Sequence, residues 1–200
     1  MRASVQTKEV RDAILDATDL LLSRYGYKKM TIDDLAREVG IGKGSVYLHF
    51  SSKEEIVLSH IDRIVDRVKE DLEKIAASKA PPEEKLREMV LSRVLIRFDN
   101  VQHYTESIDE LLSSLRAKVI ERRKQYFREE AEIFAGVIKE GQKAGEFAKG
   151  DADEFARIFV TSTNSLLPAG LSTQELGERS HVRKKALAVC GLLLKGLTNK

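Results

Sequence analysis

The sequence has little that would cross-link, stiffen or anchor the chain. Its single cysteine, Cys190, cannot form an internal disulfide, which fits a reducing compartment and leaves no cysteine-based zinc site. No apolar run approaches the roughly 20 residues that a membrane-spanning helix needs. Charges run through the apolar part of the N-terminal segment, so no signal peptide is expected there. These features predict a soluble, cytoplasmic protein.

The chain also lacks the excess of basic residues that marks many nucleic-acid-binding proteins. Its formal net charge is +2, although 33% of its residues are charged. Residues 1–60 hold nine Lys or Arg and nine Asp or Glu, a balance of zero. A case for nucleic acid must therefore come from the local arrangement of side chains.

Proline and strand-like alternation are equally scarce, and helical periodicity takes their place. Only three prolines occur, and the dominant residues carry little helix penalty. Apolar spacing and helix-ending signals predict an all-α protein of about nine helices. The expected helices lie near 7–25, 31–39, 43–50, 52–75, 82–98, 108–144 (as one helix or two), 153–167 and 181–197.

One short segment has no acidic residue at all. From Val39 to Lys53 the sequence reads "VGIGKGSVYLHFSSK", and two short predicted helices meet at its "VGIG". Glycine tolerates the backbone of a sharp reversal, so Gly40 and Gly42 favour a helix-turn-helix. The second helix would be about 12 Å long, which matches the width of the DNA major groove. Acid facing phosphate would be repelled, which accounts for its absence.

The side chains of this segment suit DNA. Lys43 and Ser45, near the start of the second helix, are expected to reach bases, whereas Tyr47, His49 and Lys53 are expected to contact phosphate. Gly42 and Gly44 leave room for a close backbone approach. The predicted DNA-binding residues are Thr31, which also caps the first short helix, Gly42, Lys43, Gly44, Ser45, Tyr47, His49 and Lys53.

Two nucleotide-binding motifs fail on this segment, while a third interpretation stays open. The phosphate-loop pattern needs glycine at the position of Arg37 and a hydroxyl residue at Gly44. The dinucleotide pattern G-x-G-x-x-G also finds no match. The remaining alternative is a tight turn between two core helices, with Val46 and Phe50 facing inward.

A resemblance extends this interpretation. The stretch Thr31 to Ile56, "TIDDLAREVGIGKGSVYLHFSSKEEI", together with "YGY" at Tyr25, resembles the DNA-binding domain of the tetracycline-repressor (TetR) family. Gly42 replaces the serine usual in that family, and Ile56 stands where leucine is common. The resemblance implies a DNA-binding domain at 1–52 and a ligand-binding and dimerisation domain at 53–200. It also implies a homodimeric repressor that a small molecule releases from a near-palindromic operator.

The same resemblance places an inducer site among the helices between Pro82 and Ala144. Apolar and aromatic side chains with a few polar ones are expected to line it. The candidates are Met89, Arg97, Phe98, His103, Tyr104, Leu111, Tyr126, Phe127 and Phe134. The broad apolar faces of the last two helices predict the dimer interface. Its candidates are Phe155, Phe159, Leu166, Val189, Leu193 and Leu197.

No cofactor and no metal site is expected. Glu178 and His181 form one E-x-x-H unit, but no other histidine has Glu three positions before it, and helical di-iron sites need two such units. No nucleophile, base and orienting group cluster, so an enzyme has no positive support. Two alternatives remain: a DNA-binding protein without a ligand switch, and a helical enzyme. The effector, the operator and the regulated genes do not follow from the sequence.

Overall fold

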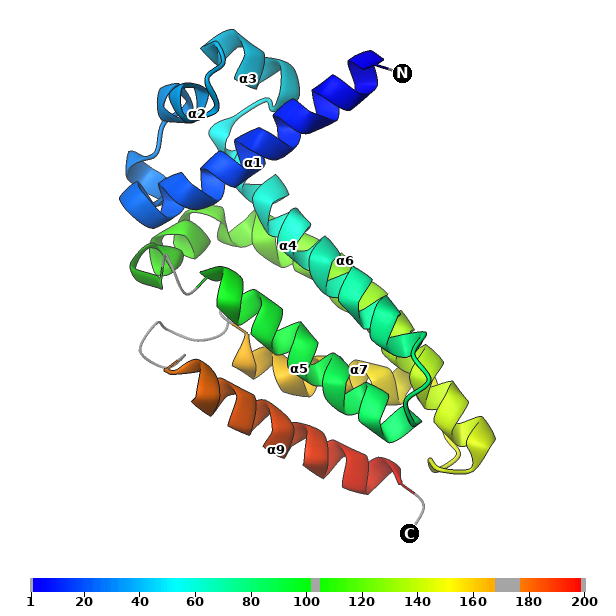
Figure 1. Ribbon diagram of the computed structural model, residues 1–200. Helices are drawn as coiled ribbons and strands as arrows, with labels where there is room; N and C mark the ends of the chain where they lie inside the picture. Colours follow the sequence, from blue (N-terminus) through cyan, green and yellow to red (C-terminus); the bar gives the residue numbers. More distant parts are fainter. Residues whose placement is uncertain (1, 102–104, 168–176, 199–200) are drawn as a thin grey trace. The chain divides into compact units, whose positions relative to one another are not determined.

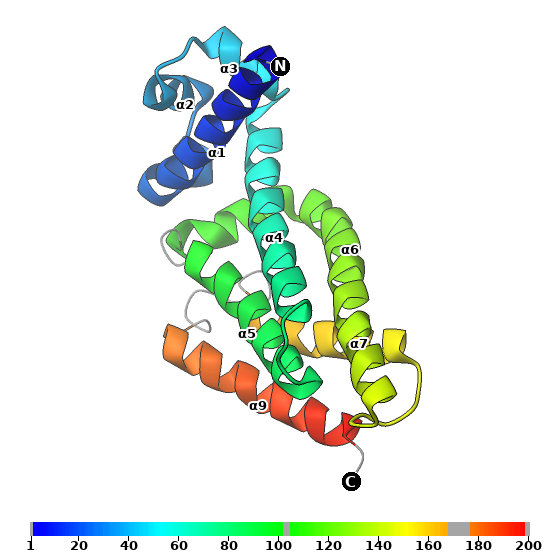
Figure 2. The same cartoon turned by 45° about the vertical axis from the view of Figure 1, so that its right-hand side comes forward.

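The computed structural model is helical along nearly all of its described length (Figures 1 and 2). It describes residues 2–101, 105–167 and 177–198, and the side chains among them except those of 2–7, 101, 105–110 and 112. Within these ranges the helices are α1 (Arg2–Lys29), α2 (Ile32–Val39), α3 (Lys43–His49), α4 (Lys53–Ala76), α5 (Pro82–Val101), α6 (Thr105–Ala144), α7 (Ala152–Thr163), the 3-10 turn η2 (Asn164–Leu166) and α9 (Arg179–Leu197). The all-α prediction is confirmed.

The chain divides into two compact units. The first comprises Met1–Ile64 and Gln102–Val119, and the second Val65–Val101 and Ile120–Lys200. Two of the three boundaries fall inside helices, because α4 and α6 each contribute residues to both units, and the third lies at the end of α5. The division expected at residue 52 followed the end of the helix-turn-helix motif, whereas the compact unit also takes in the first half of α4 and the start of α6.

In the first unit α1, α2 and α3 pack against one another. Their apolar faces bury Ile14, Leu22, Leu35 and Val46 almost completely. α1 is longer than the helix expected over 7–25, but Gly26 interrupts its helical geometry with φ 72° and ψ 173°. A side chain rarely adopts that backbone, so the glycine of the "YGY" step sets the bend at the end of α1.

In the second unit α5 packs against α9 and α7, and α7 packs against α9. α5 begins at Pro82, as expected of a proline in the first helical turn. It is buried on most sides, with Met89, Val90 and Val94 inaccessible to solvent, which is typical of a central helix.

Residues 108–144 form part of one continuous helix, so the alternative of two separate helices is wrong. α6 ends at Ala144, and Gly145, with φ 78°, turns the chain into the next segment. Phe147 then pairs with Thr198 in an isolated antiparallel bridge, and Ala148 donates to the carbonyl oxygen of Leu197 at 2.7 Å. This contact fixes the end of α9 beside the end of α6.

Candidate nucleic-acid interface

The helix-turn-helix predicted from the sequence is present in the first unit. At the start of α2, the Thr31 hydroxyl accepts from the Asp34 backbone N–H at 3.1 Å, and the Asp34 carboxylate accepts from the Thr31 N–H. These bonds form a capping box, which satisfies amides that the helix leaves free. At the other end Gly40 adopts φ 75°, and the Ile41 N–H bonds back to Ala36 at 2.9 Å. The turn therefore places α3 directly after α2.

The inner face of α3 is fixed by packing and by one arginine. Val46 and Phe50 are 0% and 1% exposed. The Arg11 guanidinium lies 4.2 Å from the centre of the Phe50 ring and donates to the carbonyl oxygen of His49 at 3.0 Å. The inward direction expected for Val46 and Phe50 is correct. α3 also has an exposed outer face, so the inward packing of Val46 and Phe50 is compatible with a DNA-binding helix-turn-helix.

The outer face of α3 carries several of the predicted DNA-binding residues. Gly42, Lys43, Gly44 and Tyr47 are exposed, and no neighbouring atom lies within 4 Å of where a Cβ would stand at either glycine. Ser45 and His49 are partly buried beside them. Leu48, which is 84% exposed, was not among the predicted DNA-binding residues. The signal was available, because inward Val46 and Phe50 leave positions 47 and 48 facing outward.

An acidic residue nevertheless reaches this face. The carboxylate of Asp33 on α2 lies 2.7 Å from the Lys43 ammonium, and both side chains are about half exposed. Its hydrogen bond to Lys43 raises the pKa of that ammonium. The acid-free stretch in the sequence is therefore not an acid-free environment in space.

Lys53 has structural partners that the sequence did not reveal. The Lys53 ammonium donates to the carbonyl oxygens of Tyr27 at 2.8 Å and Met30 at 3.1 Å. It also lies 4.5 Å from the centre of the Tyr27 ring. Lys53 thus binds the carbonyl-rich end of α1, where the helix dipole favours a cation. The Thr31 hydroxyl is occupied in the capping box.

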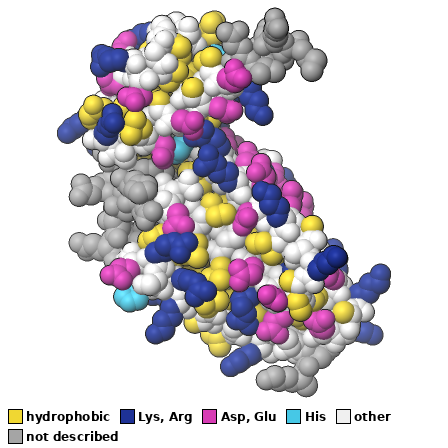
Figure 3. Space-filling model, in the orientation of Figure 1, with side chains coloured by type: hydrophobic (Ala, Val, Ile, Leu, Met, Phe, Trp, Pro, Cys, Tyr) yellow, Lys and Arg dark blue, Asp and Glu magenta, His cyan; other side chains and the backbone are white. Residues whose placement is uncertain are grey.

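On the molecular face in Figure 3, Lys and Arg side chains intermingle with Asp and Glu side chains and do not gather in one patch. The balanced charge of the sequence is therefore also balanced across this surface. The predicted contact with DNA would therefore rest on a few local side chains and not on a broad basic patch.

The residues predicted to line a ligand site have different positions in the structure. Met89, Phe98 and Phe134 lie in the hydrophobic core of the second unit. Leu111 is also buried but belongs to the first unit. Tyr126 is partly buried, and His103 and Tyr104 lie outside the described residues. Arg97 belongs to a buried charged cluster with Arg93 and Glu130.

An open groove lies between α6 and α7, with a volume of about 450 Å³. Phe127 is the predicted pocket residue that contributes to it. The lining residues are Lys124, Phe127, Arg128, Ala131, Glu132, Asp153, Arg157, Val160 and Thr161. Most of these were missed, since charged positions on a helix face gave no signal of a concave surface.

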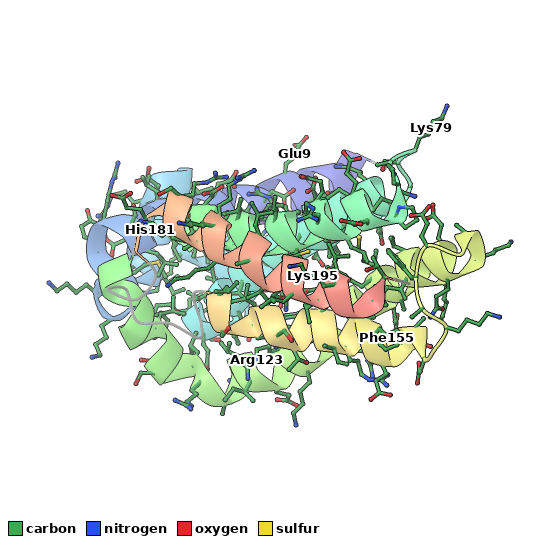
Figure 4. All side chains as sticks on the ribbon, turned by 90° about the horizontal axis from the view of Figure 1, so that it is seen from below. Glu9, Lys79, Arg123, Phe155, His181 and Lys195 are labelled. Atoms are coloured by element: carbon green, nitrogen blue, oxygen red, sulfur yellow. The ribbon has the colours of Figure 1, made fainter. Side chains whose placement is uncertain are left out.

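α7 and α9 pack against each other (Figure 4, in which Phe155 marks α7 and Lys195 marks α9), and in the described part of the chain each exposes one large apolar side chain. Ile158 is 44% exposed and Leu192 is 70% exposed. Phe155, Val189 and Leu193 are partly buried beside the core. The other three predicted interface residues, Phe159, Leu166 and Leu197, lie in the core itself. Leu192 was missed because the sequence pattern did not fix which side of α9 faces its own unit.

Neither a metal centre nor a membrane-spanning helix is found among the described residues. No three His, Cys, Asp or Glu side chains there come together as a group that would hold a metal ion. Nor does any helix in the described part of the chain have the length and apolar character to cross a membrane.

The chain matches known regulatory proteins along most of its length. A family model described as bacterial regulatory proteins of the tetR family matches residues 14–59. A model described as a tetracyclin repressor-like C-terminal domain matches residues 79–168. A fatty acid metabolism regulator protein from Bacillus subtilis is 26% identical over 196 residues, which cover 94% of this chain and 95% of the relative.

Solved structures agree with this fold. A transcriptional regulator from Cytophaga hutchinsonii superimposes with a TM-score of 0.76 at 24% identity, covering 94% of this chain and 98% of its own. SmeT is the repressor of the Stenotrophomonas maltophilia multidrug efflux pump SmeDEF. Its complex with triclosan gives a TM-score of 0.70 at 18% identity, covering 96% and 93% of the two chains.

Proposed function

We propose, from the premise that this chain belongs to the TetR family of bacterial transcriptional regulators, that it represses transcription by binding an operator until a small molecule releases it. One observation carries the DNA-binding role. α3 is fixed on its inner side by Val46 and Phe50 and exposes Lys43, Gly44 and Tyr47 on its outer side. A short helix held in this way fits the major groove, and its cation and hydroxyl suit phosphates and base edges.

The protein acts as a homodimer through α7 and α9. Large exposed apolar side chains are costly in water, and Ile158 and Leu192 lie on the two helices that pack together. A two-fold dimer carries two copies of α3, which would read half-sites about 34–36 Å apart on a near-palindromic operator. Ile158 and Leu192 support this proposal better than the core residues Phe159, Leu166 and Leu197.

A small molecule binds in the second unit and weakens DNA binding. SmeT, which forms a complex with triclosan, supports a ligand-binding role for this fold. The effector must bind the DNA-incompetent state more tightly than the DNA-competent state, and the coupling cannot exceed that difference. The operator lies in the cytoplasm, and the protein acts there without enzymatic activity.

The proposed DNA contacts are tested in two steps. Bound sequences are first selected from a random pool of DNA duplexes, and the affinity for the most enriched sequence is then measured at several salt concentrations. Lys43→Ala should weaken binding most to the preferred sequence, because Lys43 is expected to reach bases, and should lower the salt slope by at most about one unit. Tyr47→Ala should weaken binding with less change in slope, because its hydroxyl carries no charge. Arg116→Ala, an exposed change on α6, is the matched control.

Each alternative predicts a different result. If no sequence is enriched, or if Lys43→Ala and Tyr47→Ala bind like the control, the assignment of α3 to DNA is wrong. A protein that binds its operator but that no compound releases would be a DNA-binding protein without a switch. An enzyme would keep its activity after removal of the first 50 residues.

A further inference from the structure

A cluster of charged side chains lies inside the second unit, away from its surface. Arg93 on α5 is inaccessible to solvent, as is Glu130 on α6. Arg93 Nε donates to one oxygen of Glu130 at 2.5 Å, and Arg97, one turn further along α5, donates to the other oxygen. Arg93 also donates to Thr163 Oγ1 at 2.8 Å and to Asn164 Oδ1 at 2.6 Å. α5, α6, α7 and η2 therefore meet at one buried polar centre.

This cluster has one positive charge too many. It holds two guanidinium groups and one carboxylate, whereas buried charges in proteins are normally paired. The neighbouring buried Lys85 does not change the balance, because its ammonium pairs with Glu140 at 2.9 Å. Desolvation lowers the pKa of Arg93 to about 10 despite the Glu130 carboxylate, and Arg97 acts in the same direction. The centre would accommodate one further negative charge.

Arg97 is the member that retains capacity to bind. Its Nη1 donates to the carbonyl oxygen of Arg93 at 2.9 Å and its Nη2 donates to Glu130. Its Nε makes no hydrogen bond to any residue that the structure describes, and its side chain is 11% exposed. A guanidinium binds a planar carboxylate through adjacent N–H groups, so an uncommitted Nε edge suits that ligand.

The surroundings of the cluster are apolar. Val94 and Phe98 flank Arg97 along α5 and lie in the core. The Phe127 ring centre lies 5.1 Å from the Arg93 guanidinium carbon, and the same ring lines the groove between α6 and α7. A ligand with an apolar body would thus find apolar surface next to the cationic centre.

We infer that the effector is a small carboxylate with an apolar body, and that its carboxylate binds Arg97 at the Arg93–Glu130 centre. This inference rests on the proposed ligand switch and names the chemical class of its effector. A carboxylate brings a single negative charge, which equals the excess charge of the centre. A phosphate monoester brings a charge of about −1.5 to −2 at pH 7 and would overcompensate.

The alternative is that the cluster only supports the fold. A structural role and a ligand-binding role for Arg97 predict different melting temperatures for a variant that lacks this side chain. Removing Arg97 leaves one guanidinium facing one carboxylate, which is a neutral pair. Removing one partner of a buried ion pair is destabilising because it leaves a charge unpaired, but the neutral pair that remains after loss of Arg97 has no unpaired charge. A residue kept for binding need not stabilise the free protein. Arg97→Gln should therefore melt at or above the parent's temperature without ligand.

The experiment measures melting temperature and operator release with a panel of probes. The probes are decanoate, benzoate and phenylacetate, each with its neutral methyl ester, and decyl phosphate. A carboxylate at 100 times its dissociation constant should raise the parent's melting temperature by about 5–10 °C and release DNA. Its methyl ester should bind about 10- to 100-fold more weakly, because a charge-assisted hydrogen bond is lost.

Variants locate the site. Arg97→Gln should lose the preference for carboxylate over ester, and Arg97→Lys should recover part of it because the positive charge returns. Lys143→Gln removes an exposed cation near the end of α6 that does not line the groove, and it should respond like the parent. Both Arg97 variants should bind operator normally without ligand.

Several results would overturn the inference. These are equal stabilisation by acid and ester, stronger stabilisation by decyl phosphate, an unaltered response in Arg97→Gln, loss of response in Lys143→Gln, or no stabilisation by any carboxylate. Release of DNA by a neutral compound alone would leave the proposed function standing and this inference wrong. Stabilisation by carboxylates through Arg97 without any effect on DNA would establish the site and contradict the ligand switch.

Discussion

At the scale of single residues, Lys53 has hydrogen-bond partners within the fold at a position where the sequence predicts a phosphate contact. The sequence predicts a phosphate contact, whereas the structure places the ammonium on the carbonyl oxygens of Tyr27 and Met30. Hydrogen bonds from a charged group to the end of a helix typically stabilise the fold, so Lys53 connects α4 to the end of α1.

Lys53→Met is therefore expected to destabilise the protein by about 1–2 kcal/mol. Urea unfolding measures this change, and Lys28→Met, an exposed change at the end of α1, is the control. The salt slope of DNA binding should stay close to that of the parent. A Lys53→Met variant that keeps the parent's stability but whose salt slope falls by about one unit would instead support a contact between Lys53 and phosphate.

Asp33 is predicted to restrain DNA binding, because its carboxylate occupies Lys43 and lies close to where phosphate must come. Asp33→Asn removes one repulsive charge and frees the ammonium, so operator affinity should rise about 3- to 10-fold at low salt. The gain should shrink as salt increases. Glu38→Gln, another exposed acid on α2 that pairs with Arg24 at 3.7 Å, should change affinity less. Equal gains in both variants would point to net charge and not to the Asp33–Lys43 contact.

Cys190 is predicted to be an unreactive core residue. Burial raises the pKa of its thiol to about 11, above the ordinary value of 9.0. Because the raised pKa belongs to the folded state, the thiol's contribution to stability is present below pH 9 and is lost as pH rises toward 11. The stability difference between the parent and Cys190→Ala should change over that window, as thermal unfolding at each pH would measure. Rapid labelling of the native thiol at pH 8 would contradict this burial.

At the scale of elements, two glycines in long helices make a matched test of backbone geometry. Gly26 interrupts α1 with φ 72° and ψ 173°, whereas Gly136 is exposed within α6 and has open space where a Cβ would stand. Gly26→Ala should cost about 1–3 kcal/mol because alanine rarely adopts that backbone. Gly136→Ala should gain about 0.5–1 kcal/mol from helix propensity. Chemical unfolding measures the change in the free energy of unfolding for each variant. If Gly26→Ala leaves that free energy unchanged, the end of α1 tolerates a regular helix.

At the scale of the whole molecule, the exposed apolar surface of α7 and α9 predicts a dimer. Leu192→Glu places a charge where Leu192 is 70% exposed, so it should leave the monomer folded and shift sedimentation at micromolar protein toward about 22.5 kDa, the mass of one chain. Leu48→Glu introduces the same change at an exposed leucine of α3 and should remain dimeric. A parent that sediments as a monomer would contradict the dimer.

The sequence by itself determined the helical class and the helix-turn-helix. Both are local properties: apolar spacing, the cap at Thr31 and the glycine at Gly40 act within a few residues of chain. The inward direction of Val46 and Phe50 was one of the interpretations that the sequence left open. The exposed Leu48 between them shows that apolar character alone does not decide which way each side chain of α3 faces. The division into units at Ile64 and Val119 could not be predicted, because it depends on packing between distant segments and not on a break in the chain.

Tertiary structure alone decided which charges meet. Asp33 reaches Lys43 from another helix, and Lys53 reaches Tyr27 across 26 positions of sequence. Arg93 meets Glu130 and Thr163 across 37 and 70 positions. Periodicity identifies the faces of a helix but not the partner of each face, and an arginine on a helix gives no sign of the carboxylate that it will contact. The DNA-reading helix is therefore predictable from the sequence, whereas the buried Arg93–Glu130–Arg97 centre follows only from how the helices pack.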